Sequence, residues 1–275
     1  MATLPDRNSP ANANLQRFDA EADHPEFSDV ALKPAERNAI VLLADSIAEL
    51  DMLDLGVGAG RTAYTFAPLV RRYVGLDYSP RLIEHARRRI GETERISFTT
   101  GDARDLERVK ESPEYRGFDF VLFSFSGIDA VDHEGRLKVL AEVRDAIKPN
   151  GLFLFSSHST GALPLTTRRP IPDAMQGSRV YGLISPLAAR RYRRAAEAAN
   201  SEIDFAAMRK QGWTMVRDPA FDFSLDVYYI DPERQVEQLR DAGFSVEAVY
   251  NMAGESVELP YPGRDPWLDY LCRPI

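Results

Sequence analysis

The 275-residue sequence lacks the long apolar runs and the clustered cysteines that mark several classes of protein. No run approaches the ~20 apolar residues that span a bilayer. Residues 1–16 do not have the charged and then apolar order of a signal peptide. The single cysteine, Cys272, excludes an internal disulfide and a cysteine zinc cluster, and its apolar neighbours WLDYLC predict a buried, unreactive side chain. These absences predict a cytoplasmic protein without membrane contact.

The chain also lacks an excess of basic residues. The chain has 34 Lys and Arg against 42 Asp and Glu, a formal net charge of −8. Neutralising many phosphates requires a strongly basic surface, so nucleic acid is not the partner that this composition favours. The four histidines are scattered and no Asp-rich loop has a calcium-binding pattern, so we expect no metal site. With 44% hydrophobic residues, the chain can bury one large core.

What the chain does have is a glycine-rich turn after a short apolar run, in the stretch DMLDLGVGAG at residues 51–60. Gly56, Gly58 and Gly60 alternate along it. Glycine lets the backbone take positive φ and lets a ligand approach main-chain N–H groups. The pattern predicts a buried strand, a turn and a helix that starts just after Gly60. It is typical of a nucleotide-cofactor site, and also of a plain strand-to-helix turn.

Acidic residues accompany the predicted strand ends. Asp77 ends the run RRYVGLD, about 20 positions after the glycines. At this spacing a carboxylate can accept hydrogen bonds from both ribose hydroxyls. Asp102 follows a third run, residues 95–101, and Asp54 lies in the first. Because parallel strands end at one edge of a sheet, these three carboxylates are expected on the same edge.

The turn reads GxGxG, whereas dinucleotide-binding enzymes have GxGxxG, whose third glycine permits close packing of the helix beside a pyrophosphate. A nicotinamide-dependent reductase therefore fits worst, and an adenosine cofactor without a pyrophosphate fits better. In order and spacing, LDLGVGAGR, GLDYSP, TGDARDL, FDFVLFSFSGID and IKPNGLFLFSSH resemble the successive motifs of class I S-adenosylmethionine-dependent methyltransferases. The resemblance covers residues 48–158, and residues 229–273 resemble the closing part of that fold.

The resemblance implies a set of cofactor contacts. Asp54 and the glycines surround the methionine part, Asp77 binds the ribose, and Tyr78 lies against the adenine. Asp102 accepts from the adenine amine, unless it only caps a turn, and the Ala103 N–H donates to a ring nitrogen. Arg61 meets the cofactor's carboxylate or is a solvated arginine at a helix start. The full implied set is Asp54, Gly56, Gly58, Gly60, Arg61, Asp77, Tyr78, Asp102, Ala103 and Ser124.

Strands and helices alternate along most of the chain, which predicts a parallel sheet with helices on both faces. Together with the resemblance, this gives an α/β fold with a doubly wound, seven-stranded, mostly parallel sheet and one antiparallel strand in a C-terminal hairpin. The alternation fails over residues 159–226, which we expect to form a substrate cap inserted after the fifth strand. The expected division is residues 1–16 as a disordered leader, 17–158 and 227–275 as the cofactor-binding domain, and 159–226 as the cap. Expected helices span 33–50, 81–90, 136–147 and 231–242, and further strands 118–125, 152–155, 245–250 and 267–272.

The cap region is rich in arginine and in aromatic residues. An arginine cluster there favours an anionic acceptor such as a carboxylate or phosphate, although a solvated helix face explains it equally well. The aromatic segment that follows is expected to wall the pocket. The arginines are Arg168, Arg169, Arg179, Arg190, Arg191, Arg193 and Arg194, and the aromatic residues are Trp213, Phe221, Phe223, Tyr228 and Tyr229.

Methyl transfer from a sulfonium needs mainly alignment and exclusion of water. A general base would help by about 10²- to 10⁴-fold if the acceptor is a hydroxyl or a protonated amine. The candidates after the fourth and fifth strands are Asp129, His133 and His158, and each residue could instead be a cap or a polar core residue. The sequence SFSG stands where nucleobase methyltransferases have an Asn/Asp-Pro-Pro-Tyr/Phe-type signature, which disfavours nucleobases.

The predicted function is therefore S-adenosylmethionine-dependent methylation of an oxygen or nitrogen of a small molecule, anionic compounds included. An RNA or protein methyltransferase and a non-catalytic S-adenosylmethionine-binding protein stay open as alternatives. The sequence does not specify the acceptor or the oligomeric state.

Overall fold

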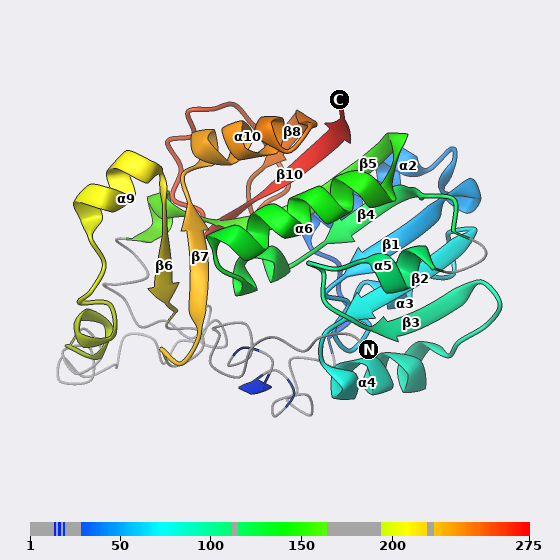
Figure 1. The fold of residues 1–275 in the computed structure, drawn as a ribbon. Helices are drawn as coiled ribbons and strands as arrows, with labels where there is room; N and C mark the ends of the chain where they lie inside the picture. The colour runs from blue at the N-terminus through cyan, green and yellow to red at the C-terminus, as the bar shows by residue number, and fades with distance from the viewer. Residues whose placement is uncertain are drawn as a thin grey trace, which may run out of the picture.

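A computed structural model describes residues 14, 16, 17, 19, 29–111, 115–163, 194–218 and 223–275. Most of these residues form one twisted sheet with helices on both faces, and the β6–β7 hairpin stands at one end of it (Figure 1). Several residues of the predicted cap lie outside the described residues: Arg168, Arg169, Arg179, Arg190, Arg191, Arg193 and Phe221.

The first half of the sheet is built by three strand–helix units, as the alternation predicts. Its strands are β1 (Asp51–Leu55), β2 (Arg72–Asp77) and β3 (Ile96–Thr100). Its helices are α2 (Pro34–Leu43), α3 (Ala63–Phe66), α4 (Pro80–Ile90) and α5 (Glu107–Lys110), with a 3₁₀ turn, η2, at Ile47–Glu49. The predicted single helix over 33–50 is wrong in its last part. It ends at Leu43, and Ser46 interrupts it with a non-helical backbone before the chain enters β1.

The second half adds the remaining strands of the sheet. Its strands are β4 (Phe118–Phe123), β5 (Ile147–Ser159), β6 (Trp213–Arg217), β7 (Asp226–Ile230), β8 (Phe244–Tyr250), β9 (Ser256–Val257) and β10 (Trp267–Pro274). Its helices are α6 (His133–Ala146), α9 (Phe205–Gln211) and α10 (Pro232–Asp241), with 3₁₀ turns η3 (Gly127–Ala130) and η4 (Thr160–Ala162). Helix α6 begins three residues before the expected start because the Asp132 side chain caps it, accepting from the Gly135 N–H at 2.8 Å.

The strand order is β3-β2-β1-β4-β5-β10-β8-β9. Strands β1 to β5 pair in parallel, and β10 runs antiparallel between β5 and β8. The predicted doubly wound sheet with one antiparallel strand and a C-terminal hairpin is confirmed for the seven strands from β3 to β8. The predicted strand-like segment after Trp213 forms the β6–β7 hairpin, which joins β5 through the pair His158 and Tyr229.

Two hydrophobic clusters cover the two faces of the sheet. On one face, α6 and α10 pack Val139, Val143 and Leu239 against the strands. On the other, α2, α3 and α4 contribute residues that include Phe66 and Ile83. Removing this apolar surface from water is the main stabilising contribution to a fold of this kind.

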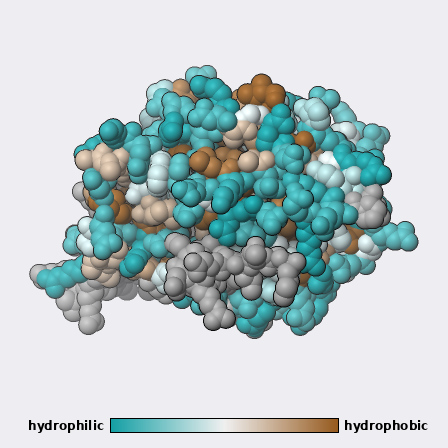
Figure 2. All heavy atoms as spheres, in the orientation of Figure 1, coloured by the Kyte–Doolittle hydropathy of each residue, from teal (hydrophilic) through white to brown (hydrophobic). Residues whose placement is uncertain are grey.

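The face of the molecule in Figure 2 is mostly hydrophilic, with small, separate hydrophobic groups. No helix in the described part of the chain is long and apolar enough to cross a membrane. Cys272 is fully buried, as predicted, and burial raises the pKa of its thiol.

In Figure 1 the arrowheads of β1, β2, β3 and β4 face the same side, toward the β6–β7 hairpin.

Candidate cofactor and acceptor site

The glycine turn after β1 has the backbone that the sequence predicts. Gly56, Gly58 and Gly60 have φ values of +63°, +56° and +88°, a region that favours glycine. A Cβ on Gly56 would lie 2.8 Å from the ring of Phe123, whereas a Cβ on Gly58 would meet no atom of the described residues within 4 Å. The turn is therefore packed against β4 on one side and open beside Gly58.

Asp77, at the end of β2, is held against this turn. Its Oδ2 accepts from the Gly58 N–H at 2.9 Å, and its Oδ1 accepts from the Ser79 N–H at 2.9 Å. The residue is only 4% exposed, and burial raises the pKa of its carboxyl to about 6, against the opposing effect of the backbone hydrogen bonds. Each oxygen keeps acceptor capacity for a ligand hydroxyl.

Asp54 lies beneath the turn. Its Oδ2 accepts from the hydroxyls of Thr62 and Tyr73, both at 2.5 Å, and the residue is 1% exposed. Burial raises the pKa of this carboxyl to about 7. These contacts brace the turn from below. The predicted contact of Asp54 with the methionine part stays a prediction.

Arg61 is neither a solvated arginine nor a free cation. Its guanidinium forms two hydrogen bonds with the buried carboxylate of Glu36, at 2.5 and 2.7 Å, and one with the Ser124 hydroxyl at 2.8 Å. Glu36 also accepts from the Lys33 N–H at the start of α2. This ion pair ties α2 to the turn and to the end of β4. The sequence reasoning missed Glu36, whose position three residues after Lys33 in the first turn of the helix was the available signal.

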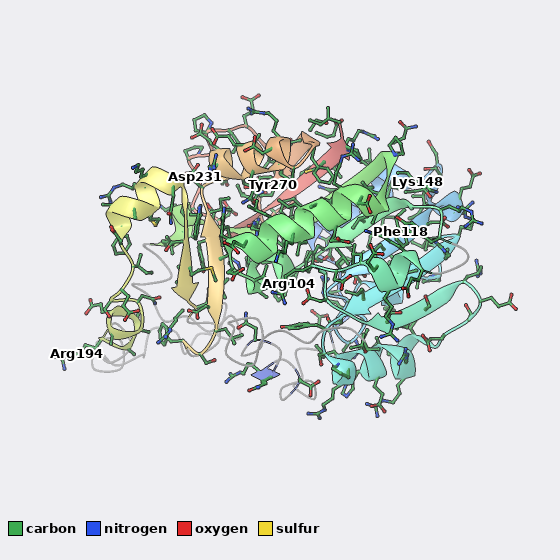
Figure 3. All side chains as sticks on the ribbon, in the orientation of Figure 1. Arg104, Phe118, Lys148, Arg194, Asp231 and Tyr270 are labelled. Carbon is green, nitrogen blue, oxygen red and sulfur yellow. The ribbon has the colours of Figure 1, made fainter. Side chains whose placement is uncertain are left out.

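Tyr78, Asp102 and Ala103 lie at the ends of β2 and β3, and all three are partly buried. Asp102 caps a turn by accepting from the Arg104 N–H at 2.9 Å, and it pairs with the Arg104 guanidinium at 2.6 Å. Figure 3 shows Arg104 at the side of the sheet where these strands end. Burial, Asp77 and Asp102 raise the pKa of Tyr78 well above its ordinary value. Their predicted contacts with adenine stay predictions.

Asp129, in η3 after β4, contacts His158 near the end of β5, and both are candidate catalytic residues. Its Oδ2 accepts from the backbone N–H of His158 at 2.7 Å and lies 2.8 Å from His158 Nδ1. Its Oδ1 accepts from the Ser157 hydroxyl at 2.9 Å and from the guanidinium of Arg136. The Nδ1 contact leaves Nε2 of His158 as the acceptor nitrogen of the neutral ring. Asp129 and His158 are thus brought together as a hydrogen-bonded pair.

His133 lies apart from that pair, at the start of α6. Its ring stacks on Trp213 at a centroid distance of 4.3 Å, and its Nδ1 is 2.7 Å from the Tyr228 hydroxyl. Burial and the nearby Arg136 and Arg234 lower the pKa of His133. These contacts join α6 to the β6–β7 hairpin. A catalytic role for His133 stays a prediction.

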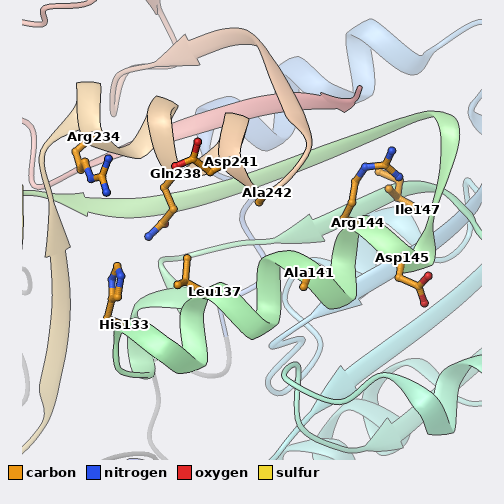
Figure 4. A pocket seen from close by; sticks show the side chains of 10 residues that line it. All are labelled: His133, Leu137, Ala141, Arg144, Asp145, Ile147, Arg234, Gln238, Asp241 and Ala242. Carbon is orange, nitrogen blue, oxygen red and sulfur yellow. The ribbon is translucent and has the colours of Figure 1, made fainter.

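A groove of about 710 Å³ runs between α6 and α10 from His133 to Arg144 (Figure 4). Its lining is His133, Leu137, Ala141, Arg144, Asp145, Ile147, Arg234, Gln238, Asp241 and Ala242. It follows the helices on one face of the sheet, whereas the glycine turn and Asp77 lie at the strand ends. Arg194 is exposed, and Figure 3 shows it at the outer end of the molecule on the side of the β6–β7 hairpin.

Sequence reasoning also missed Arg136, the largest side chain that is fully buried in the described part of the chain. Its guanidinium contacts Asp129, Ser157, Gln235 and Gln238. The available signal was its place in the apolar period of α6, three, four and seven residues before Val139, Leu140 and Val143.

Comparisons with known proteins identify the domain that carries this turn. Residues 52–151 match the family described as "Methyltransferase domain". The chain is 32% identical over 117 residues to a demethylmenaquinone methyltransferase of Clavibacter sepedonicus, an alignment covering 42% of this chain and 44% of the relative. It is 28% identical over 152 residues to an uncharacterized methyltransferase of Bacillus subtilis, covering 54% of each. The chain spans about half the length of these curated relatives.

Solved structures share the whole fold. An S-adenosylmethionine-dependent methyltransferase of Clostridium acetobutylicum matches with a TM-score of 0.58 at 14% identity, over 94% of this chain and 98% of the other. The 1,6-didemethyltoxoflavin N1-methyltransferase of Burkholderia thailandensis, bound to its acceptor and S-adenosylhomocysteine, matches with a TM-score of 0.57 at 17% identity, over 100% and 92%. The strand order and these matches agree that the chain has the fold of these methyltransferases, and residues 52–151, which include the glycine turn, match the methyltransferase domain family.

Proposed function

We propose that the protein is a methyltransferase that binds S-adenosylmethionine at the glycine turn and methylates an oxygen or a nitrogen of a small molecule in the cytoplasm. The observation that carries the proposal is the open glycine turn held to a buried carboxylate, with Gly58 donating to Asp77 at 2.9 Å. A Cβ on Gly58 would meet no atom of the described residues within 4 Å, which supports a ligand site beside the turn. The residues present fit the cofactor.

The chain's own residues supply binding and alignment in this proposal. Asp77 accepts from the ribose hydroxyls, and Tyr78, Asp102 and Ala103 contact the adenine. The cofactor, when bound, supplies an activated methyl group on a sulfonium, which needs little further activation. The protein therefore has mainly to align the acceptor and exclude water, which is worth roughly 7–11 kcal/mol in well-oriented reactions.

A small-molecule acceptor is favoured by the charge of the chain and by the names of similar proteins. The net charge of −8 disfavours a polyanionic acceptor such as RNA. Similar proteins include enzymes named for demethylmenaquinone and 1,6-didemethyltoxoflavin, both small molecules. The sequence also predicted an anionic acceptor from the arginine cluster. Of that cluster, only Arg194 lies in the described residues.

Calorimetric titration with S-adenosylmethionine and S-adenosylhomocysteine tests the cofactor proposal. We expect binding of both, and we expect Asp77→Asn to weaken it by about 1.5–3 kcal/mol for each hydrogen bond lost from the carboxylate. Asp45→Asn, on an exposed aspartate outside the site, is the control and should leave the affinity unchanged. A folded protein that gives no binding heat with either compound would refute the proposal.

A further inference from the structure

We propose that Phe125, Trp267 and His158 form a site for a flat aromatic acceptor with an acidic O–H group, a phenol, and that Nε2 of His158 takes the phenol proton. This inference rests on the proposed function, because it names the acceptor class of the same site. Its observations are a strained and exposed aromatic residue with a cation over its ring, a neighbouring indole, and a histidine oriented by a buried carboxylate.

Phe125 has a backbone that a large side chain rarely adopts. Its φ is +53°, and the next residue, Ser126, has a φ of +57°. The Ser126 N–H donates to the hydroxyl of Ser156 at 2.6 Å, which fixes the second of these residues from the neighbouring strand. Non-glycine residues in this region cost of order 1–3 kcal/mol each and cluster at ligand sites.

The strained backbone holds the Phe125 ring in solvent, where it contributes little to the core. The residue is 59% exposed, and its ring meets that of Trp267 edge-on at a centroid distance of 5.9 Å. Trp267 is partly buried at the start of β10 and also meets the ring of His158 edge-on, at 6.4 Å. The indole therefore lies between the exposed phenyl ring and the histidine. Aromatic faces in such an arrangement favour a planar, aromatic ligand.

The ammonium of Lys33 lies 4.7 Å from the centre of the Phe125 ring. A cation there attracts a ring that carries negative charge, so it favours a phenolate over a neutral alcohol. This position is also beside the glycine turn, because Lys33 starts the helix whose Glu36 binds Arg61. The aromatic residues and the proposed cofactor site therefore share one edge of the sheet.

His158 has the arrangement of an oriented base. The carboxylate of Asp129 holds both its backbone N–H and its Nδ1, and the ring packs on Tyr229 at a centroid distance of 4.9 Å. Asp129 is fully buried and is itself held by Arg136 and Ser157. The His158 side chain is 18% exposed, so its ring reaches the surface while its orientation is fixed. Such a pairing sets the tautomer that accepts a proton on Nε2.

The step balances with the cofactor of the proposed function as the methyl donor. The phenol O–H bond breaks and its proton forms a bond to His158 Nε2, leaving an imidazolium beside Asp129. The oxygen then shares an electron pair with the methyl carbon as the carbon–sulfur bond breaks. That bond's electrons return to sulfur and neutralise the sulfonium. No oxidant, reductant or metal is needed.

Binding of 4-nitrophenol tests the inference without any methyl transfer, because the compound changes colour when it loses its proton. The full chain is saturated with S-adenosylhomocysteine, and the phenol is titrated at a pH where the free compound is mostly protonated. We expect saturable binding by calorimetry together with the absorbance of the phenolate. His158→Gln should keep most of the binding and lose the phenolate absorbance, because the amide cannot take the proton.

The Phe125→Ala variant separates the aromatic contact from the proton transfer. Loss of a ring contact predicts a dissociation constant for 4-nitrophenol that is about two- to tenfold higher, with unchanged affinity for S-adenosylhomocysteine. Phe125→Tyr should retain binding. Phe205→Ala is the matched control, because Phe205 is a 49% exposed phenylalanine on α9. Thermal unfolding of each variant verifies that it is folded.

The outcomes distinguish this inference from the proposed function. Binding of S-adenosylhomocysteine without binding of 4-nitrophenol overturns the phenol site and leaves the methyltransferase proposal standing. Binding that Phe125→Ala and Phe205→Ala weaken equally also overturns it. Phenolate absorbance that persists in His158→Gln overturns the assignment of the base. Absence of S-adenosylhomocysteine binding refutes the proposed function itself.

Discussion

At the scale of single residues, two aspartates of the glycine-turn region have different environments although both lie near the ends of neighbouring strands. Asp54 faces into the protein and is bound by Thr62 and Tyr73, whereas Asp77 is bound by backbone N–H groups at the edge of the sheet. The first braces the turn, and the second is the carboxylate that we propose to bind the ribose. Their order in the sequence does not reveal this difference, because it depends on which face of the strand each side chain occupies.

The titration of Asp77 predicts a pH dependence of cofactor binding. Burial raises its pKa to about 6, and only the ionised carboxylate accepts from both ribose hydroxyls. Binding should therefore weaken as the pH falls through 6, by about tenfold at pH 5. Calorimetry with S-adenosylhomocysteine across this range measures the effect, and Asp77→Asn should remove most of it. A constant affinity in the wild-type protein would contradict the prediction.

A second prediction at this scale concerns the strain at Phe125. Glycine adopts a φ of +53° without the penalty that phenylalanine pays, although it has more freedom in the unfolded chain. We expect Phe125→Gly to raise the free energy of unfolding by about 1 kcal/mol, because ~1–3 kcal/mol of strain is relieved and ~0.5–1 kcal/mol is lost to the freedom of glycine in the unfolded chain. Urea denaturation measures this change. Phe125→Ala keeps the strain and is the comparison. Equal or lower stability of the glycine variant would show that the ring contacts outweigh the strain.

At the scale of elements, one buried arginine joins a helix, a strand and a second helix. Arg136 of α6 binds Asp129 after β4, Ser157 of β5, and Gln235 and Gln238 of α10. The guanidinium and the Asp129 carboxylate are both fully buried. A buried ion pair of this kind is costly to break, because the partner left behind keeps an uncompensated charge.

Arg136→Met should therefore lower the free energy of unfolding by about 3–5 kcal/mol. Urea denaturation measures it, with Arg240→Met on the exposed side of α10 as a control expected within about 0.5 kcal/mol of the wild type. Adding Asp129→Leu to Arg136→Met should recover part of the loss, because the stranded charge is gone. Asp129→Leu alone is measured as well. If the double variant loses as much stability as Arg136→Met and Asp129→Leu lose together, the two residues are not coupled.

At the scale of the whole molecule, three buried carboxyls link stability to pH. Burial raises the pKa of Asp54, Asp77 and Asp269 to about 7, 6 and 8, from an ordinary value of 3.8. For Asp269 the carboxylate of Glu36 adds to the effect. Each carboxyl holds a proton in the folded state at a pH where the unfolded chain has released it. Its stabilising contribution is present below about pH 4 and is lost as the pH rises through the folded-state pKa.

Asp269→Asn tests this linkage with a near-isosteric change. The wild type should lose stability between pH 5 and pH 8.5, and the variant should lose less, because one of the raised carboxyls no longer titrates. Chemical denaturation at each pH gives the free energies. Asp45→Asn, at an exposed position, should leave the pH dependence as it is. An identical slope in Asp269→Asn would contradict the raised pKa.

The fold followed from sequence wherever a local pattern decided the structure. The apolar runs at β1, β2 and β4 and the glycine turn depend on neighbours in sequence, so the strand positions and the positive φ values were predictable. The helix over 33–50 was predicted too long, because its apolar period continues past Ser46 while the chain must turn into β1. The strand ending at Phe125 was also predicted too long, since the strained residues 125 and 126 turn the chain away after Phe123.

What the sequence determined by itself is the order of elements, the doubly wound sheet and the likeness of residues 52–151 to methyltransferase domains, because periodicity, glycine spacing and motif order are properties of the chain. Only the tertiary structure decided which polar side chains meet. Arg61 binds Glu36, 25 residues away, and Arg136 binds Gln235, 99 residues away. It also paired Asp129 with His158 while placing His133 against Trp213. Hydrogen bonds act over about 3 Å, so such partners are set by how strands and helices pack, and a single sequence does not encode that packing in any local pattern.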